Sequence, residues 1–162
     1  MLTILSGGQT GVDRAALDAA IEEGIAYGGW CPKDGWAEDM LKPPGLRSLY
    51  RRLQETPRAD PRERTEWNVR DADRLLLLVD KAGLGVSQGS HAARDFAVKL
   101  GKPHSVIDLD AADALEQARA FLDAAAPGAK LCIAGPRESE APGIYAKAKA
   151  FLRTAFGRMR GK

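Results

Sequence analysis

The stretch Leu75-Leu76-Leu77-Leu78-Val79 decides the fold that the sequence predicts. It is an unbroken apolar run without the alternation of a half-exposed strand, and such strands are typical of parallel sheets that are covered on both faces. A glycine-rich turn follows at residues 80–90. Ser87 or Ser90 can cap the next helix, which Gly101 is expected to end. The stretch therefore predicts a buried strand, a turn and a helix in succession.

The same alternation continues on both sides of this unit. Short apolar runs predict further strands at residues 2–6, 25–30, 103–109 and 130–134. Apolar residues at helical spacing predict helices at residues 11–24, 114–125 and 144–155. Asp110 and Ser139 are expected to cap the last two, with Pro142 in the first turn of the last, and a short helix is expected at residues 62–74. Alternation of this kind predicts an α/β fold with three α/β/α layers around an open, mostly parallel sheet.

Residues 31–63 interrupt the pattern. They contain five of the nine prolines, mixed charges and no clear period. We expect a long irregular excursion with one or two helical turns. Loops of this length in small domains are usually functional, so the segment is either a lid over a site or a packing flap. The length of 162 residues otherwise fits one domain over residues 1–162.

The charge balance argues against general nucleic-acid binding. The chain has 24 Lys and Arg against 22 Asp and Glu, a net charge of +2. Residues 141–162 contain no acid and six bases, which fits a solvated helix face or a surface for an anionic partner. These bases are Lys147, Lys149, Arg153, Arg158, Arg160 and Lys162. A mean hydropathy of -0.30 excludes a polytopic membrane protein.

Cysteine and histidine usage predicts no metal site. Cys31 and Cys132 form no CxxC motif, and His91 and His104 complete no zinc spacing. The residues that precede Gly7-Gly8 contain neither a basic segment nor a long apolar run, so no signal peptide is expected. A reduced, cytoplasmic protein without a membrane partner fits these features.

Three strand-to-helix turns carry the candidate site. The first spans residues 6–14, the second residues 80–90 and the third residues 135–139. Glycines let a ligand approach the backbone, and free N–H groups at helix starts favour anions. The first turn matches neither the P-loop motif GxxxxGK[ST] nor the dinucleotide-binding motif GxGxxG. The turns follow parallel strands and should meet at one edge of the sheet, which predicts a small anionic, phosphate-bearing ligand.

The residues predicted to bind this ligand come from the three turns and one lysine beyond the second strand. They are Gly7, Gly8, Gln9, Thr10, Gly11, Asp13, Arg14, Lys33, Gly83, Gly85, Ser87, Gly89, Ser90, Gly135 and Arg137. Simple tight turns remain the alternative for the glycines, and Arg137 is as well suited to pairing with Glu138 or Glu140. Trp67 fits either a stacking surface or, better, a packing residue. No catalytic residue can be assigned.

Four segments carry a resemblance to a known family. They are Ser6–Ala15, Gly28–Lys33, Arg64–Val69 and Ala134–Ser139, and they run through nearly the whole chain. The chain resembles the "putative molybdenum carrier" family, also described as circularly permuted YpsA-like proteins of the SLOG superfamily. The resemblance implies a Rossmann-like fold, a bacterial cytoplasmic protein that is often a homo-oligomer, and a nucleotide-like ligand such as the phosphorylated pterin of molybdenum cofactor.

One loop departs from related enzymes. Relatives with phosphoribohydrolase activity carry a PGGxGTxxE loop, whereas Val86 stands here for its threonine and Gly89 for its glutamate. We therefore expect a binding or carrier protein. The alternative is a nucleotide phosphoribohydrolase-like enzyme that acts on nucleoside monophosphates, with Asp13 or Asp80 as its acid. Nucleic-acid binding by the basic last helix is the least favoured interpretation.

Overall fold

The computed structural model describes residues 1–157 and 159. Within them, five strands form one parallel sheet in the order β2-β1-β7-β5-β6. These strands are β1 (Thr3–Leu5), β2 (Ala26–Gly28), β5 (Arg74–Val79), β6 (His104–Asp108) and β7 (Lys130–Ala134). The helices are α1 (Val12–Glu22), α2 (Pro61–Asp71), α3 (Gln88–Lys99), α4 (Ala114–Asp123) and α5 (Ile144–Gly157). The predicted α/β fold is confirmed.

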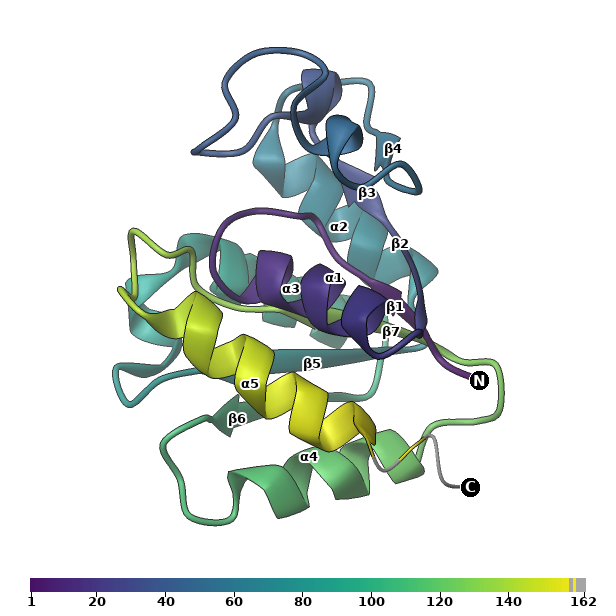
Figure 1. Cartoon of the computed structure of the whole chain (residues 1–162), viewed down its shortest axis with the longest axis vertical. Coiled ribbons are helices and arrows are strands. Elements are labelled where there is room, and N and C mark those ends of the chain that lie inside the picture. Colours follow the sequence, from purple (N-terminus) through teal and green to yellow (C-terminus); the bar gives the residue numbers. More distant parts are fainter. Residues whose placement is uncertain (158, 160–162) are drawn as a thin grey trace.

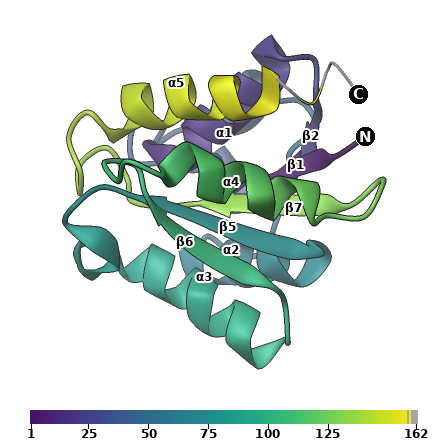
Figure 2. The ribbon, with the colours of Figure 1, turned by 90° about the horizontal axis from the view of Figure 1, so that it is seen from below.

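The helices cover both faces of the sheet (Figure 2). Helices α1, α4 and α5 pack on one face around Ile4, Ile133 and Phe156, and α2 and α3 pack on the other around Val69 and Phe96. The molecule thus has the three α/β/α layers that the sequence predicts. Apolar burial on both faces is what makes the central strands continuous apolar runs.

Strand β5 shows this directly. Leu76 and Leu78 belong to the core on the α1, α4 and α5 side, whereas Leu75 and Leu77 belong to the core on the α2 and α3 side. All four side chains are fully buried. Successive residues of a strand point to opposite faces, so each face of β5 needs an apolar residue at every second position.

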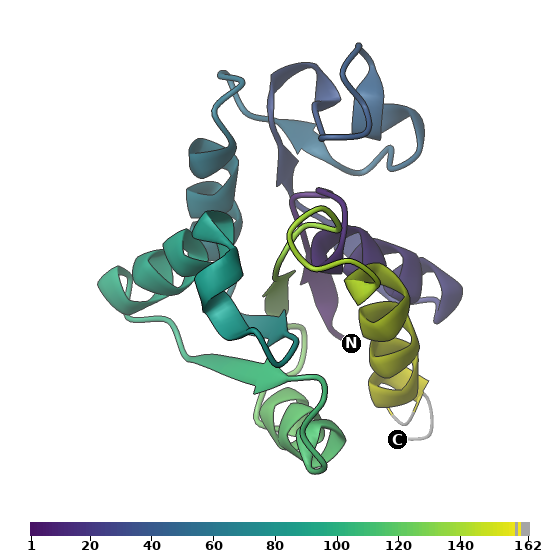
Figure 3. The same cartoon turned by 90° about the vertical axis from the view of Figure 1, so that its left-hand side faces the viewer.

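The excursion at residues 31–63 forms a small unit at one end of the molecule (Figures 1 and 3). It holds single 3₁₀ turns at Lys33–Gly35 and Gly45–Ser48, which fit the predicted helical turns. Strands β3 (Trp30–Cys31) and β4 (Gln54–Glu55) form a second, parallel sheet that the sequence did not predict. A third apolar cluster attaches this unit to α1, and its members include Leu17, Cys31, Leu46, Tyr50 and Leu53.

The helix starts follow the sequence only in part. The Ser87 hydroxyl accepts a hydrogen bond from the Ser90 N–H and caps α3, as predicted. Asp110 does not cap α4, because this helix begins later and the Asp110 carboxylate instead meets the Lys81 N–H and the Lys147 ammonium group.

The prediction of a Ser139 cap on the last helix is also wrong. Helix α5 begins at Ile144, so Pro142 precedes it instead of lying in its first turn. The Glu138 carboxylate accepts hydrogen bonds from the Gly143 and Tyr145 N–H groups. A longer side chain thus reaches across the turn to the helix start.

The described bases of the last helix pair with acids of the same molecule. Lys147 pairs with Asp110, and Lys149 and Arg153 both pair with Glu22. These pairs favour a solvated helix face over an anion-binding surface. Arg158, Arg160 and Lys162 lie outside the described residues. None of the described helices combines the length and the hydropathy that a bilayer crossing requires.

Candidate functional site

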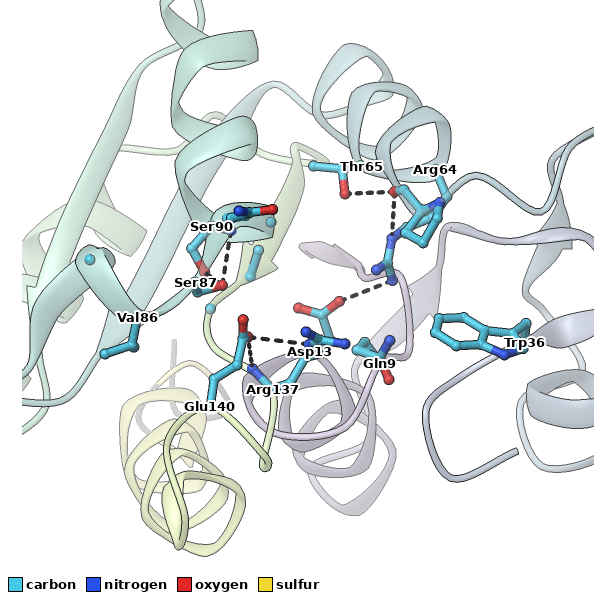
Figure 4. Close-up of a pocket in the computed structure, with 16 residues that line it drawn as sticks. Gln9, Asp13, Trp36, Arg64, Thr65, Val86, Ser87, Ser90, Arg137 and Glu140 are labelled. Atoms are coloured by element: carbon cyan, nitrogen blue, oxygen red, sulfur yellow. Dashed lines mark hydrogen bonds and ion pairs between the residues drawn. The ribbon is translucent and has the colours of Figure 1, made fainter. Parts of the chain in front are cut away.

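The three predicted turns meet at the edge where β1, β5 and β7 end (Figure 3). A cleft of about 650 Å³ lies there, lined by residues of these turns, of α2 and of the excursion (Figure 4). Eight of the predicted binding residues line this cleft, namely Gln9, Asp13, Gly85, Ser87, Gly89, Ser90, Gly135 and Arg137. Trp36, Arg64, Thr65, Val86 and Glu140 also line it, although the sequence did not single them out for the site. The volume suits a nucleotide-sized molecule.

The glycines of the first and third turns permit close packing within the protein. A Cβ atom on Gly7 would lie 2.3 Å from Nη1 of Arg64, and one on Gly11 would lie 2.2 Å from the Pro136 carbonyl oxygen. Gly135 lines the cleft, yet a Cβ atom there would meet the Leu78 carbonyl oxygen at 2.3 Å. These residues bring the turns together, which is a structural reason for glycine independent of any ligand.

Gly85 and Gly89 differ from the glycines of the first and third turns, because neither is closely packed against the protein. A Cβ atom on either would meet no protein atom within 4 Å, and neither has a positive φ. The protein's own packing therefore does not require glycine at these two positions of the cleft. Gly83 also has open space, but its φ of 71° favours glycine by itself, and it does not belong to the lining.

Helix α3 points its first turn into the cleft. Ser87 and Ser90 are buried there, and the Ser90 hydroxyl donates to the Ser87 hydroxyl over 2.9 Å. The N–H groups of Gln88 and Gly89 open the helix, where backbone donors have no partner within the helix itself. Together with the helix dipole they can hold an anion.

Asp13 lies in the cleft and is almost fully buried. Burial raises the pKa of its carboxyl group to about 6, although the Arg64 guanidinium and the backbone N–H groups of Gln9 and Gly135 favour the ionised form. Nη1 of Arg64 lies 3.5 Å from the carboxylate and also donates to the Gly7 carbonyl oxygen. A carboxyl group of this kind can gain and lose a proton near neutral pH.

Arg137 is the second cation of the cleft. Its guanidinium lies 3.4 Å from the Glu140 carboxylate and 3.6 Å from that of Glu38. The Glu140 carboxylate also accepts the Arg137 N–H at 2.8 Å. The pairing of Arg137 with Glu140 that the sequence offered as an alternative is thus present. When Asp13 is ionised, the formal charges of the lining residues Asp13, Arg64, Arg137 and Glu140 sum to zero.

Seven of the fifteen predicted residues do not belong to the lining, namely Gly7, Gly11 and Gly83, described above, and Gly8, Thr10, Arg14 and Lys33. Arg14 donates to the Gly8 carbonyl oxygen and forms two hydrogen bonds with Asp39. The Thr10 hydroxyl donates to Glu38. Gly8 has a φ of 73° and packs against Leu46, and Lys33 is exposed in the excursion. Lys33 therefore brings no charge to the cleft, and Thr10 and Arg14 attach the excursion to the first turn.

Glu38 joins the excursion to two turns at once. Burial opposes ionisation of its carboxyl group, but hydrogen bonds from Thr10 and Ser139 keep its pKa below the ordinary value. Its backbone N–H donates to Oε1 of Gln9 over 3.0 Å. The excursion is thereby fixed beside the cleft.

The sequence missed Arg64 and Trp36 as site residues. Arg64 belongs to the quoted segment Arg64–Val69, and its spacing gave no sign that the side chain would lie beside Asp13. In the same segment, Trp67 packs against Trp30 with ring centroids 4.7 Å apart. Asn68 binds both the N–H and the carbonyl group of Trp30. Trp67 is thus a packing residue.

The cysteines are not suited to metal binding. Burial raises the pKa of the Cys31 thiol to about 11 and also raises that of Cys132. Among the residues that the structure describes, no three His, Cys, Asp or Glu side chains gather into a metal-binding group. The cleft offers N–H donors, hydroxyl groups and an indole ring instead.

Comparison with known proteins identifies the family. The model of the circularly permutated YpsA SLOG family matches residues 4–156. The chain belongs to this family. A crystal structure of a "putative molybdenum carrier protein" from Syntrophus aciditrophicus is 39% identical, with a TM-score of 0.79, over 95% of this chain and 93% of that one. No curated protein matches the chain. The Rossmann-like fold of this SLOG family member is the one that the resemblance implied.

Proposed function

We propose that this SLOG protein binds or carries a nucleotide-like molecule through its phosphate group. The observation that carries the proposal is the opening of α3 into the 650 Å³ cleft beside the buried hydroxyl groups of Ser87 and Ser90. A phosphate group placed there would accept hydrogen bonds from the Gln88 and Gly89 N–H groups. Arg137, which lines the same cleft, would add positive charge.

Gly85 and Gly89 support this placement. Neither packing nor backbone conformation within the described structure demands glycine there. A ligand that approaches the backbone closely would demand it, because a Cβ atom would occupy the space that the ligand needs.

Molybdenum cofactor is a candidate ligand of this site. The Syntrophus relative is named as a putative molybdenum carrier, and the phosphorylated pterin of molybdenum cofactor offers a phosphate group and a planar ring. The cleft offers N–H donors that would bind the phosphate and the indole ring of Trp36 on which the pterin ring would stack. Since the described residues form no metal-binding group, the protein would hold the organic part of the cofactor.

Calorimetry tests the proposal. The purified protein is titrated with ribose 5-phosphate, nucleoside monophosphates, inorganic phosphate and molybdate, and native mass spectrometry identifies molecules that co-purify with it. We expect phosphate esters to bind. If ribose 5-phosphate and every nucleoside monophosphate fail to bind, and no phosphorylated molecule co-purifies, the proposal is overturned.

Asp13 favours a second candidate function, which is hydrolysis of nucleoside monophosphates. A carboxyl group with a pKa of about 6 in the cleft can protonate the leaving base or accept a proton from the attacking water. Water would add to the sugar carbon as the bond to the base breaks. Asp80, the other acid considered, does not line the cleft, and its carboxylate binds the Ala82 N–H.

Base release distinguishes the two functions. Incubation with a panel of nucleoside monophosphates should yield free base if the protein is an enzyme, and Asp13→Asn should abolish the release. Binding without turnover would leave the carrier function as the better description.

The resemblance also predicts a homo-oligomer. Light scattering during size-exclusion chromatography measures the mass directly. A mass of 17.4 kDa at all concentrations would contradict this prediction.

A further inference from the structure

Trp36 stands across the cleft from the start of α3. Figure 4 shows Ser87 and Ser90 on one side and Trp36 on the other, with Asp13 and Gln9 between them. Among the ring contacts of the described residues, none involves Trp36. Its indole ring is only partly buried and can therefore offer a face to a molecule in the cleft.

The backbone on both sides of Trp36 is fixed. A Cβ atom on Gly35 would lie 2.2 Å from the Pro44 carbonyl oxygen, so the chain is tightly packed just before the tryptophan. Ala37, just after it, is fully buried in the third apolar cluster. The Glu38 N–H then binds Oε1 of Gln9. An aromatic residue held in place in this way loses little conformational freedom when a ring stacks on it.

Gln9 presents hydrogen-bond donors beside this ring. Its Oε1 atom accepts the N–H groups of Thr10 and Glu38, both at 3.0 Å, which sets the orientation of the amide. No described residue accepts a hydrogen bond from its Nε2 atom. Because Gln9 lines the cleft, its free amide hydrogens select a ligand atom that accepts hydrogen bonds.

We propose that Trp36 and Gln9 form a subsite for a planar heteroaromatic ring whose edge accepts hydrogen bonds, carried on the same molecule as the phosphate. The inference rests on the proposed phosphate site at the start of α3. It names the ligand class as oxopurine nucleotides and pterin phosphates, since plain sugar phosphates leave this side of the cleft unused. Trp36 supplies the stacking face and Gln9 the donors for a ring carbonyl group.

Calorimetry with inosine 5′-monophosphate and ribose 5-phosphate measures what the ring contributes. We expect the nucleotide to bind about tenfold more tightly than the sugar phosphate. Trp36→Ala should erase this advantage and leave the affinity for ribose 5-phosphate within about twofold. Trp36→Phe should keep most of the advantage. Trp67→Phe, which changes a tryptophan outside the cleft, should leave both affinities unchanged.

A nucleotide without the carbonyl group tests Gln9 without a mutation. Purine riboside 5′-monophosphate should bind several-fold more weakly than inosine 5′-monophosphate, because it offers no carbonyl oxygen to Nε2. Fluorescence provides a second readout, since stacking on Trp36 should quench an emission component that Trp36→Phe removes.

The outcomes separate this inference from the proposed function. Equal affinities for inosine 5′-monophosphate and ribose 5-phosphate, or a parallel loss of both in Trp36→Ala, would overturn the ring subsite alone. If purine riboside 5′-monophosphate binds as tightly as inosine 5′-monophosphate, the role of Gln9 is wrong. If neither ribose 5-phosphate nor any nucleoside monophosphate binds to the unmodified protein and no phosphorylated molecule co-purifies with it, the phosphate site is overturned and the subsite with it.

Discussion

The carboxylate of Asp13 lies 3.5 Å from the guanidinium of Arg64, although the two residues are 51 positions apart in the chain. Both side chains are buried, and together they join the first turn to α2 at the cleft. A buried ion pair contributes little net stability, because removing two charges from water costs about as much as their attraction returns. Its consequence is electrostatic, since the charge of the cleft depends on whether Asp13 holds a proton.

Anion affinity should rise as pH falls through about 6. The ionised cleft is neutral overall, and protonation of Asp13 leaves a net positive charge on Arg64 and Arg137 against Glu140. Loss of one negative charge from the cleft removes its repulsion of the anion, which is worth on the order of 1 kcal/mol or more at an effective dielectric constant of about 20. Sulfate, which does not titrate in this range, should bind about tenfold more tightly at pH 5 than at pH 7.5.

Asp13→Asn removes the titrating carboxyl group from the cleft, so its sulfate affinity should change less between the two pH values than that of the unmodified protein. Calorimetry on both proteins measures the effect. Parallel pH profiles of the two proteins would contradict the role of Asp13.

Asp13 should also shape the pH dependence of stability. Its pKa is about 6 in the folded protein, against the ordinary value of 3.8 that applies to the unfolded chain. Between these values the folded state binds the proton more tightly, so protonation stabilises the fold. The contribution is fully present below about pH 4 and is lost as pH rises through 6; it amounts to at most about 3 kcal/mol.

Urea unfolding of the unmodified protein and Asp13→Asn at pH 4 and pH 7 isolates this contribution. The free energy of unfolding of the unmodified protein, relative to that of the variant, should be larger at pH 4. The subtraction removes the effect of acids such as Asp39, whose pKa its hydrogen bond with Arg14 lowers. If this difference in the free energy of unfolding is the same at both pH values, burial does not raise the pKa of Asp13.

Gly89→Ala should separate binding from stability. The residue lies in the first turn of α3 with open space around its Cα atom, so alanine should fold well and add up to about 1 kcal/mol through its helix propensity. The added methyl group should weaken phosphate-ester binding at least about tenfold. Thermal unfolding and calorimetry report the two effects.

Gly157→Ala is the matched control. This glycine also lies in a helix, no atom of residues 1–157 or 159 comes within 4 Å of its Cβ position, and it does not line the cleft. It should leave ligand affinity unchanged. Equal affinities of the Gly89→Ala variant and the unmodified protein would place the phosphate elsewhere.

Glu38→Ala should loosen the excursion. The carboxylate binds the Thr10 and Ser139 hydroxyl groups and lies near Arg137, so its removal breaks side-chain links from the excursion to the first and third turns and leaves the Arg14–Asp39 pair in place. The variant should lose about 1 kcal/mol of local stability and show faster hydrogen exchange at the amides of residues 37–40. Because Trp36 belongs to the same segment, binding of inosine 5′-monophosphate should weaken more than binding of ribose 5-phosphate.

Glu55→Ala serves as its control, since the Glu55 carboxylate pairs with Arg47 within the excursion. In the Glu55→Ala variant, the amides of residues 37–40 should exchange hydrogen at the same rate as in the unmodified protein. If both variants speed exchange equally, Glu38 is not the specific attachment.

The order of strands and helices could be read from the sequence because it depends on local periodicity. Leu75 to Val79 and the helix stripes show which faces are apolar, and the carboxyl ends of parallel strands must share an edge. The turns at residues 6–14 and 80–90 therefore meet as predicted. The sequence predicted the helix starts less well. The Glu138 carboxylate, and not the Ser139 hydroxyl group, binds N–H groups at the start of α5, and α4 begins only after Asp113, whose side chain does not cap it.

The sequence by itself determined the fold class, the family motifs and the edge of the sheet at which the cleft forms, because these follow from apolar periodicity and from short runs of neighbouring residues. The tertiary structure alone decided which side chains face the cleft. Arg14 turned to Asp39 and Lys33 stayed exposed. Trp36 entered the cleft from the irregular excursion, and Arg64 entered it from α2, a helix that the sequence predicted without showing which of its side chains would face the cleft. The reason is that the direction of a side chain in an irregular segment is set by partners far away in the chain, such as Gln9 for Glu38, and spacing carries no information about them.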